Sequence, residues 1–134
     1  HGKHVVLVDD SLIRATTLPK ATHLVRQAGA CKVSAVISSP MYRYQDFYGI
    51  DTCRVRSELI AWNENGDTDA IREKCGLDYL GYLSLDSTIK AVLTAGKEMR
   101  PEMYQRAGSK LSENSFYTGP FTGIYPAGQG KLFD

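Results

Sequence analysis

The 134-residue sequence lacks long apolar runs, a strong net charge and closely paired cysteines. No apolar stretch approaches the ~20 residues of a membrane-spanning helix, and no signal peptide opens the chain. The net charge of +1 gives no field that would attract nucleic acid or an anionic membrane. We therefore expect a cytoplasmic protein that has neither a nucleic-acid partner nor a membrane partner.

Cysteine is sparse and widely spaced. Cys31, Cys53 and Cys75 are odd in number and form no C-x-x-C pair. That pattern argues against a disulfide framework and against a zinc knuckle, and it fits a reducing compartment. A starting methionine is absent too, because the chain opens at His1 and reaches an apolar stretch within a few residues. We expect a fragment or a processed product of a longer protein.

The first third of the chain has the pattern of a β-α-β unit. Residues 4–8 form a short, β-branched apolar run, which is typical of a strand buried on both faces. Residues 16–28 carry apolar side chains at helical spacing, with Pro19 in the first turn and Gly29 as a stop. Residues 32–38 form the next strand, which a right-handed crossover places parallel to the first.

The rest of the sequence predicts further elements and an α/β fold, with a mostly parallel sheet and flanking helices. Helices are expected at 55–62, 68–75 and 86–95, and a strand at 78–83. Asp67 or Thr68 is available as an N-cap for the second of these helices, and Gly76 as its stop. We divide the chain into residues 1–96 and residues 97–134, the second part being a helical segment with an extended tail.

Aromatic side chains gather in two irregular segments. The first, residues 41–54, holds a cluster that could stack on a base, contact a subunit or pack as a loop, and we favour the packed loop. The second, FYTGPFTGIYP, is expected to pack on the domain or on a neighbouring subunit. The cluster in the first segment consists of Met41, Tyr42, Tyr44, Phe47 and Tyr48.

The turn after the first strand carries the strongest chemical signal. Asp9 and Asp10 stand side by side at the end of the strand, and Thr16 and Thr17 stand where the helix begins. A helix N-terminus with hydroxyl groups suits a phosphate monoester, whereas two adjacent carboxylates suit vicinal hydroxyls. A diol a few ångströms from a phosphate describes a ribose 5-phosphate, so this order of residues predicts a sugar-phosphate site.

Two other readings of the acidic pair stay open on the residues alone. Asp9 and Asp10 could be a helix cap and a surface charge, with no ligand. Paired acids in this position also hold magnesium, as in receiver domains or Walker-B sites. A P-loop nucleotidase is disfavoured because the motif G-x-x-x-x-G-K-[ST] is absent.

The stretch VVLVDDSLIRATT resembles the phosphoribosyl pyrophosphate (PRPP) motif of type I phosphoribosyltransferases. The variant D-D-S-x-x-R-G-T-T is typical of the glutamine phosphoribosylpyrophosphate amidotransferase family. Other segments resemble that family in the same order and together cover nearly the whole chain. They are RQAGACKVSAVISSP, FYGIDT, ELIA, DAIREKCGLDYLGYLS and FTGIYP.

The resemblance implies a type I phosphoribosyltransferase-like fold and roles for the residues of the turn. Asp9 and Asp10 would bind the ribose hydroxyls of PRPP or of a purine nucleoside monophosphate, and could meet Mg²⁺ through the ligand. Ser11 would support the turn. The 5-phosphate would lie in a cradle formed by Arg14, Ala15, Thr16 and Thr17. The family makes 5-phosphoribosylamine from PRPP and glutamine in purine synthesis, and its members associate as homo-oligomers.

The sequence departs from the family pattern at four positions. One lies in the loop, and the other three bear on a cofactor of the family. Ala15 stands where the family has glycine, which would cost about 1 kcal/mol if the position needs a positive φ. Tyr117, Pro120 and Asp46 stand where many members have the cysteines of an iron–sulphur cluster. We therefore expect no such cluster here.

The family's glutaminase domain, its pyrophosphate loop and its flexible catalytic loop all precede the PRPP motif. None of them is present in this sequence, so we expect no catalytic residue in it and no activity from the fragment alone. Two alternatives remain. One is a non-catalytic regulator that senses PRPP or a nucleotide with the same fold, and the other is a degenerate paralogue that serves as a structural subunit.

Overall fold

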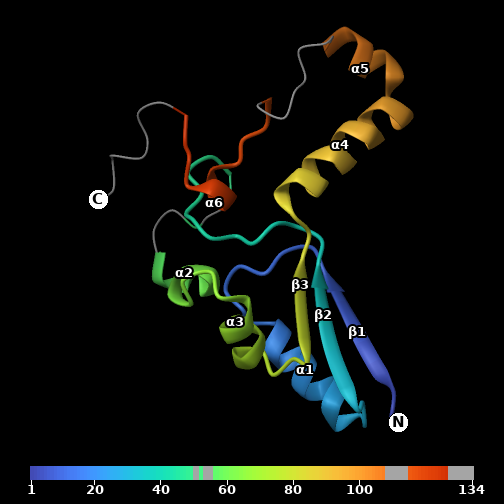
Figure 1. The fold of residues 1–134 in the computed structure, drawn as a ribbon, viewed down its shortest axis with the longest axis vertical. Coiled ribbons are helices and arrows are strands. Elements are labelled where there is room, and N and C mark those ends of the chain that lie inside the picture. The colour runs from blue at the N-terminus through green and yellow to red at the C-terminus, as the bar shows by residue number, and fades with distance from the viewer. Residues whose placement is uncertain (50–51, 53–55, 108–114, 127–134) are drawn as a thin grey trace.

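The computed structural model describes residues 1–49, 52, 56–107 and 115–126. Within these residues, three parallel strands form one sheet in the order β1-β2-β3 (Figure 1). The α/β class and the parallel pairing predicted from the sequence are confirmed. The strands are β1 (His4–Asp9), β2 (Lys32–Ile37) and β3 (Tyr79–Tyr82).

The described helices follow the expected order along the chain, except that a short helix, α6, lies within the tail predicted to be extended. Two of them, α1 and α3, pack against the sheet, and α4 and α5 project away from it (Figure 1). None of the described helices is both long enough and apolar enough to span a membrane. The helices are α1 (Leu18–Gln27), the 3₁₀ turn η1 (Arg56–Glu58), α2 (Ile60–Asn63), α3 (Thr68–Lys74), α4 (Leu85–Met99), α5 (Pro101–Ala107) and α6 (Gly119–Thr122).

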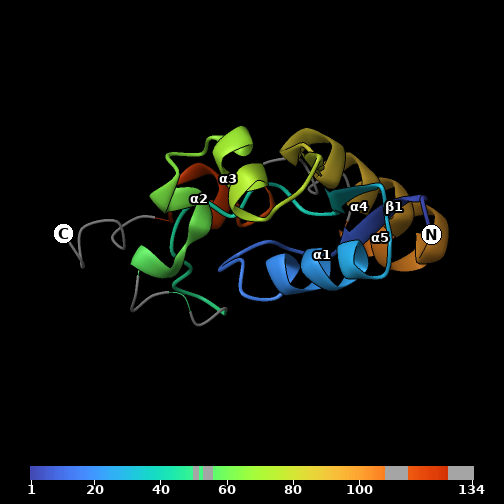
Figure 2. The ribbon, with the colours of Figure 1, turned by 90° about the horizontal axis from the view of Figure 1, so that it is seen from below.

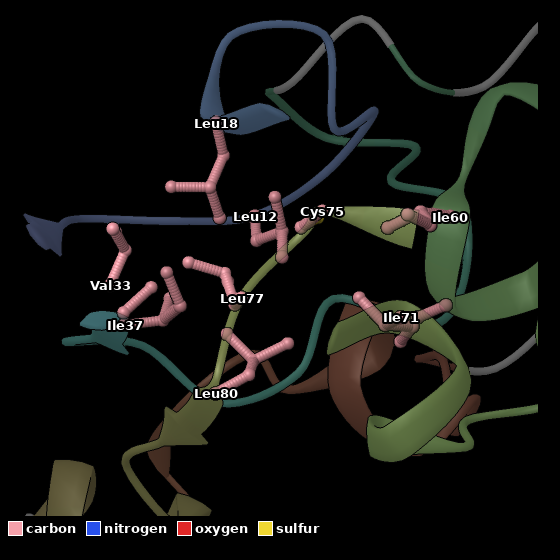
Figure 3. Close-up of a cluster of buried hydrophobic side chains, with 11 residues drawn as sticks. Leu12, Leu18, Val33, Ile37, Ile60, Ile71, Cys75, Leu77 and Leu80 are labelled. Carbon is pink, nitrogen blue, oxygen red and sulfur yellow. The ribbon is translucent and has the colours of Figure 1, made fainter. Parts of the chain in front are cut away.

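The sheet has one covered face and one uncovered face. Val33, Ala35 and Ile37 of β2 lie on the covered face, fully buried in one core with Leu18 of α1 and Ile71 of α3. Figure 3 shows Val33 and Ile37 in this cluster. On the opposite face, Val6 and Val8 of β1 are 52% and 75% exposed. The prediction that this strand is buried on both faces is therefore wrong, because among the described residues no helix packs on its second face. An unbroken apolar run does not tell whether a strand is covered on one face or on both.

The predicted helix at 55–62 is broken in the structure, and its first residue lies outside the described range. The 3₁₀ turn η1 comes first, Leu59 is extended with φ −78° and ψ 114°, and α2 begins at Ile60. The backbone N–H of Ile60 donates to the carbonyl of Ile13 at 2.9 Å rather than to a helical partner. In both overall views the turn between β1 and α1 accordingly lies beside the start of α2 (Figures 1 and 2). A tertiary contact here overrides local helical spacing.

Two other helices show why their ends fall where they do. Asp67 caps α3 as expected, since its carboxylate accepts hydrogen bonds from the N–H groups of Asp69 and Ala70. Helix α4 runs past the predicted end at residue 95 and continues to Met99. It stops at Arg100, whose φ of −140° and ψ of 57° are non-helical, because the residue before a proline is disfavoured in the α region.

Candidate functional site

A loop of residues 10–17 joins β1 to α1 at the carboxyl end of the sheet. Leu12 and Leu18 anchor it, because both side chains are buried in the core beside Ile37 and Leu77 (Figure 3). Helix α1 begins at Leu18, two residues later than expected, so that Thr16 and Thr17 belong to the loop. Buried leucines thus fix both ends of a segment whose polar residues stay accessible.

The loop surrounds a hollow of about 310 Å³. Of the seven predicted site residues, all but Asp10 line it, together with Leu12, Ile13, Leu18 and the more distant Thr52. The structure therefore brings one carboxylate, several hydroxyl groups and an arginine around one space. The predicted residues that line it are Asp9, Ser11, Arg14, Ala15, Thr16 and Thr17.

The two aspartates hold different positions. Asp9 ends β1 in the sheet: its carbonyl accepts the N–H of Ser38 at 2.9 Å, and its Oδ1 accepts the N–H of Asp10 at 3.0 Å. Asp10 is exposed, and its Oδ1 accepts the hydroxyl of Ser11 at 3.1 Å. The hydroxyl of Ser11 thus bonds to the second carboxylate within the turn.

Ala15 adopts the left-handed conformation, with a φ of 52°. Its methyl group lies half-buried against the core. The left-handed conformation costs a residue with a Cβ atom roughly 1–2 kcal/mol, whereas it costs glycine nothing. The loop therefore has the backbone shape that glycine favours, and Ala15 is held in it at a cost.

We predict that Ala15→Gly raises the free energy of unfolding by about 0.5–1 kcal/mol, because relief of the left-handed strain exceeds the loss of a half-buried methyl. Urea denaturation of the 134-residue chain measures this. Ala28→Gly is the matched control: Ala28 has φ −71° at the end of α1, so the same change there should lower stability. Equal destabilisation by both substitutions would contradict the strain at Ala15.

Two residues that sequence reasoning did not assign meet the loop from other segments. Glu58 of η1 pairs with Arg14, with 2.5 Å between Oε2 and Nε. Thr52 lines the hollow and is itself buried; its Oγ1 accepts the N–H of Asp46 at 2.8 Å and lies 3.0 Å from the hydroxyl of Tyr42. Only the family-like segments ELIA and FYGIDT, which contain them, could have drawn attention to these residues.

The described part of residues 41–54 packs as a loop, as favoured from the sequence, and residues 115–126 cover it. Tyr42 packs edge-on against Phe121 and Tyr48 against Tyr117, with ring centroids 6.1 and 4.8 Å apart. The N–H groups of Arg43 and Tyr44 both donate to the carbonyl of Pro120. The expected packing of the aromatic tail on the domain is confirmed for these residues.

The same packing brings together positions singled out in the sequence. The hydroxyl of Tyr117 donates to Oδ1 of Asp46 at 3.5 Å. Burial and the nearby Asp46 carboxylate raise the pKa of Tyr117 to about 12, and burial raises the pKa of Tyr42 to about 12. Both phenols therefore stay neutral near pH 7. Among the described residues, no group of three or more His, Cys, Asp or Glu side chains is placed to hold a metal ion.

The parallel sheet, the acidic pair at the end of β1, the left-handed Ala15 and the helix α1 that follows form an arrangement that the chain shares with solved structures of the type I phosphoribosyltransferase fold. The chain superimposes with a TM-score of 0.72 on the Bacillus subtilis glutamine PRPP amidotransferase solved with ADP and GMP, at 35% identity over 94% of this chain and 24% of that one. A structure of the allosteric regulatory enzyme of purine biosynthesis matches similarly, with a TM-score of 0.73 at 36% identity.

Sequence relatives agree. The chain is 39% identical over 125 residues to the amidophosphoribosyltransferase of Rhizobium etli and 42% identical over 91 residues to that of Bacillus subtilis. These matches cover 93% and 68% of this chain. No family model matches. The chain belongs to the amidophosphoribosyltransferase family, and it spans about a fifth of the length of the curated relatives that it matches.

Proposed function

We propose that this chain is the part of an amidophosphoribosyltransferase that binds PRPP and ribose 5-phosphate compounds, in the enzyme that makes 5-phosphoribosylamine from PRPP and glutamine. The observation that carries the proposal is the hollow formed by Asp9 and the loop 11–18. It combines a carboxylate for hydroxyl groups with threonines and a helix N-terminus for a phosphate, within one space of about 310 Å³.

The site separates the two ends of such a ligand. Thr16 and Thr17 stand just before α1, where the first N–H groups of the helix have no acceptor within the helix and the dipole favours an anion. Asp9 stands at the end of β1, at the other end of the loop. A 5-phosphate near the threonines would then place the ribose hydroxyls toward the aspartates.

Magnesium would enter with the pyrophosphate of PRPP. Mg²⁺ binds through one or two carboxylates together with substrate phosphates and keeps several waters, so the pair Asp9 and Asp10 fits an ion that the ligand also holds. When bound, the ion supplies charge neutralisation for the departing pyrophosphate. The residues of this chain would bind the ribose and the 5-phosphate and hold both groups in a fixed position.

The whole enzyme needs more than these residues. We propose that a glutaminase domain supplies the ammonia, that the enzyme works in the cytoplasm as a homo-oligomer, and that purine nucleoside monophosphates compete for the same phosphate cradle. The nucleotides in the B. subtilis relative support the last point. The 134-residue chain by itself should bind such ligands weakly and catalyse nothing.

Calorimetric titration of the 134-residue chain with GMP tests the proposal. We expect heat of binding with a dissociation constant on the order of 1 mM, equivalent to about −4 kcal/mol. Guanosine, which lacks the phosphate, and 2′-deoxy-GMP, which lacks one hydroxyl of the diol, should bind more weakly. Absence of heat at millimolar GMP, with an intact circular dichroism spectrum, would refute binding; equal affinity for the deoxy ligand would refute the role of the carboxylates.

A further inference from the structure

A second hollow, of about 390 Å³, borders the phosphate loop. Arg14, Ala15 and Thr16 line both hollows, so this part of the loop forms the wall between them. Helices α1, α2 and α3, the turn η1 and Glu64, which follows α2, supply the rest of the second lining. Those residues are Pro19, Ser57, Glu58, Ile60, Asn63, Glu64 and Lys74.

Residues 58–60 hold the loop from the side of the second hollow. The carboxylate of Glu58 contacts Nε of Arg14 at 2.5 Å. One residue earlier in the loop, the carbonyl of Ile13 accepts the N–H of Ile60 at 2.9 Å. Two consecutive loop residues are thus tied to one short segment, which lies more than forty positions away along the chain.

The position of Glu58 decides what this contact can do. Glu58 lines the second hollow and is not among the residues that line the first. Its negative charge therefore does not face the space proposed for the phosphate, where it would repel the ligand. Nε lies on the stem side of the guanidinium, so a partner there restricts the orientation of the group, and the two terminal nitrogens lie on its far side.

We propose that Glu58 is a positioning residue, which sets the orientation of Arg14 for the 5-phosphate; this inference rests on the proposed function. Both side chains are nearly half exposed, at 46% and 44%, so the pair contributes little to stability. Its effect lies in binding, because an arginine held in place before the ligand arrives loses less conformational freedom when the ligand binds.

The test compares two matched substitutions in the same hollow. Glu58→Gln removes the negative charge that pairs with Nε of Arg14. Glu64→Gln is the control, because Glu64 pairs with Lys74 of α3, outside the loop. By calorimetry, Glu58→Gln should weaken the binding of ribose 5-phosphate about three- to tenfold, whereas Glu64→Gln should leave it unchanged. Unchanged or tighter binding in Glu58→Gln would overturn the proposal.

A double-mutant cycle separates positioning from a general structural role. In an Arg14→Met background, Glu58→Gln should have no further effect on the affinity, because its only route to the ligand is then gone. Glu58→Asp should restore part of the affinity in the background with Arg14 intact. If Glu58→Gln weakened binding equally in both backgrounds, the residue would act by shaping η1 and not through Arg14.

An NMR readout decides the matter without a ligand. The order parameter of the Arg14 Nε–H group should fall in Glu58→Gln and stay unchanged in Glu64→Gln. An order parameter that is unchanged in both variants would overturn the positioning role. If the unmodified chain failed to bind ribose 5-phosphate, the proposed function would fail, and the Nε–H measurement alone would then show whether Glu58 orients Arg14.

Discussion

Replacing Asp9 and Asp10 together by asparagine should abolish detectable GMP binding. Asparagine keeps the size of the side chain and one acceptor oxygen, but it removes the charge that strengthens a hydrogen bond from a ribose hydroxyl. A hydrogen bond to a charged group is worth about 1–1.5 kcal/mol more than a neutral one, so weakening one such bond at each of two positions predicts a decrease in affinity of about 30- to 150-fold. Calorimetric titration at the concentrations used for the unmodified chain measures it.

Stability measurements should show that this loss of binding does not come from unfolding. The two adjacent carboxylates repel each other, so the double variant should be at least as stable as the unmodified chain. Asp86→Asn, in the first turn of α4, is the control: Asp86 is not among the residues that line the hollow, so this variant should bind GMP normally. Retained affinity in the Asp9→Asn, Asp10→Asn variant would mean that these carboxylates do not meet the ligand.

Val33→Ala and Val8→Ala each remove two methyl groups from a strand of the sheet. Their effects on the free energy of unfolding should differ strongly. Val33 of β2 is fully buried, whereas Val8 of β1 is 75% exposed. We expect Val33→Ala to lower the free energy of unfolding by about 2–3 kcal/mol, through lost burial and the remaining cavity. Val8→Ala should cost at most about 0.5 kcal/mol, mainly through lower strand propensity.

Urea denaturation of the 134-residue chain gives both values. Equal and large losses would show that the second face of the sheet is covered in solution, for instance by association of the chains. In that case the loss at Val8 should shrink as the protein is diluted, whereas the loss at Val33 should stay the same.

The β-α-β unit and the site loop could be predicted because their determinants are local. A strand pattern, a turn with acids and hydroxyls, and a helix with Pro19 in its first turn lie in sequence within one short segment. The parallel pairing of β1 and β2 then follows from the handedness of the crossover. The left-handed position of Ala15 could be suspected for the same reason, through the glycine that the family places there.

What could not be predicted depends on contacts between distant segments. Nothing near Leu59 in sequence says that the helix must break, because the break serves a hydrogen bond between Ile60 and Ile13. The pairing of Glu58 with Arg14 and the approach of Thr52 to the loop are equally non-local. The exposure of Val8 depends on which elements cover the sheet, and the apolar run VVLV is compatible with either case.

Helix α4 has a consequence for how the molecule unfolds. It has 15 residues, but of these Ile89, near its start, is the buried one. The turns beyond Ile89 can therefore open and exchange their amide hydrogens without disturbing the core of Val33, Ile37 and Leu80. We therefore expect a cooperative unit, built on the sheet and the phosphate loop, and a helical extension whose amide hydrogens exchange before those of the sheet.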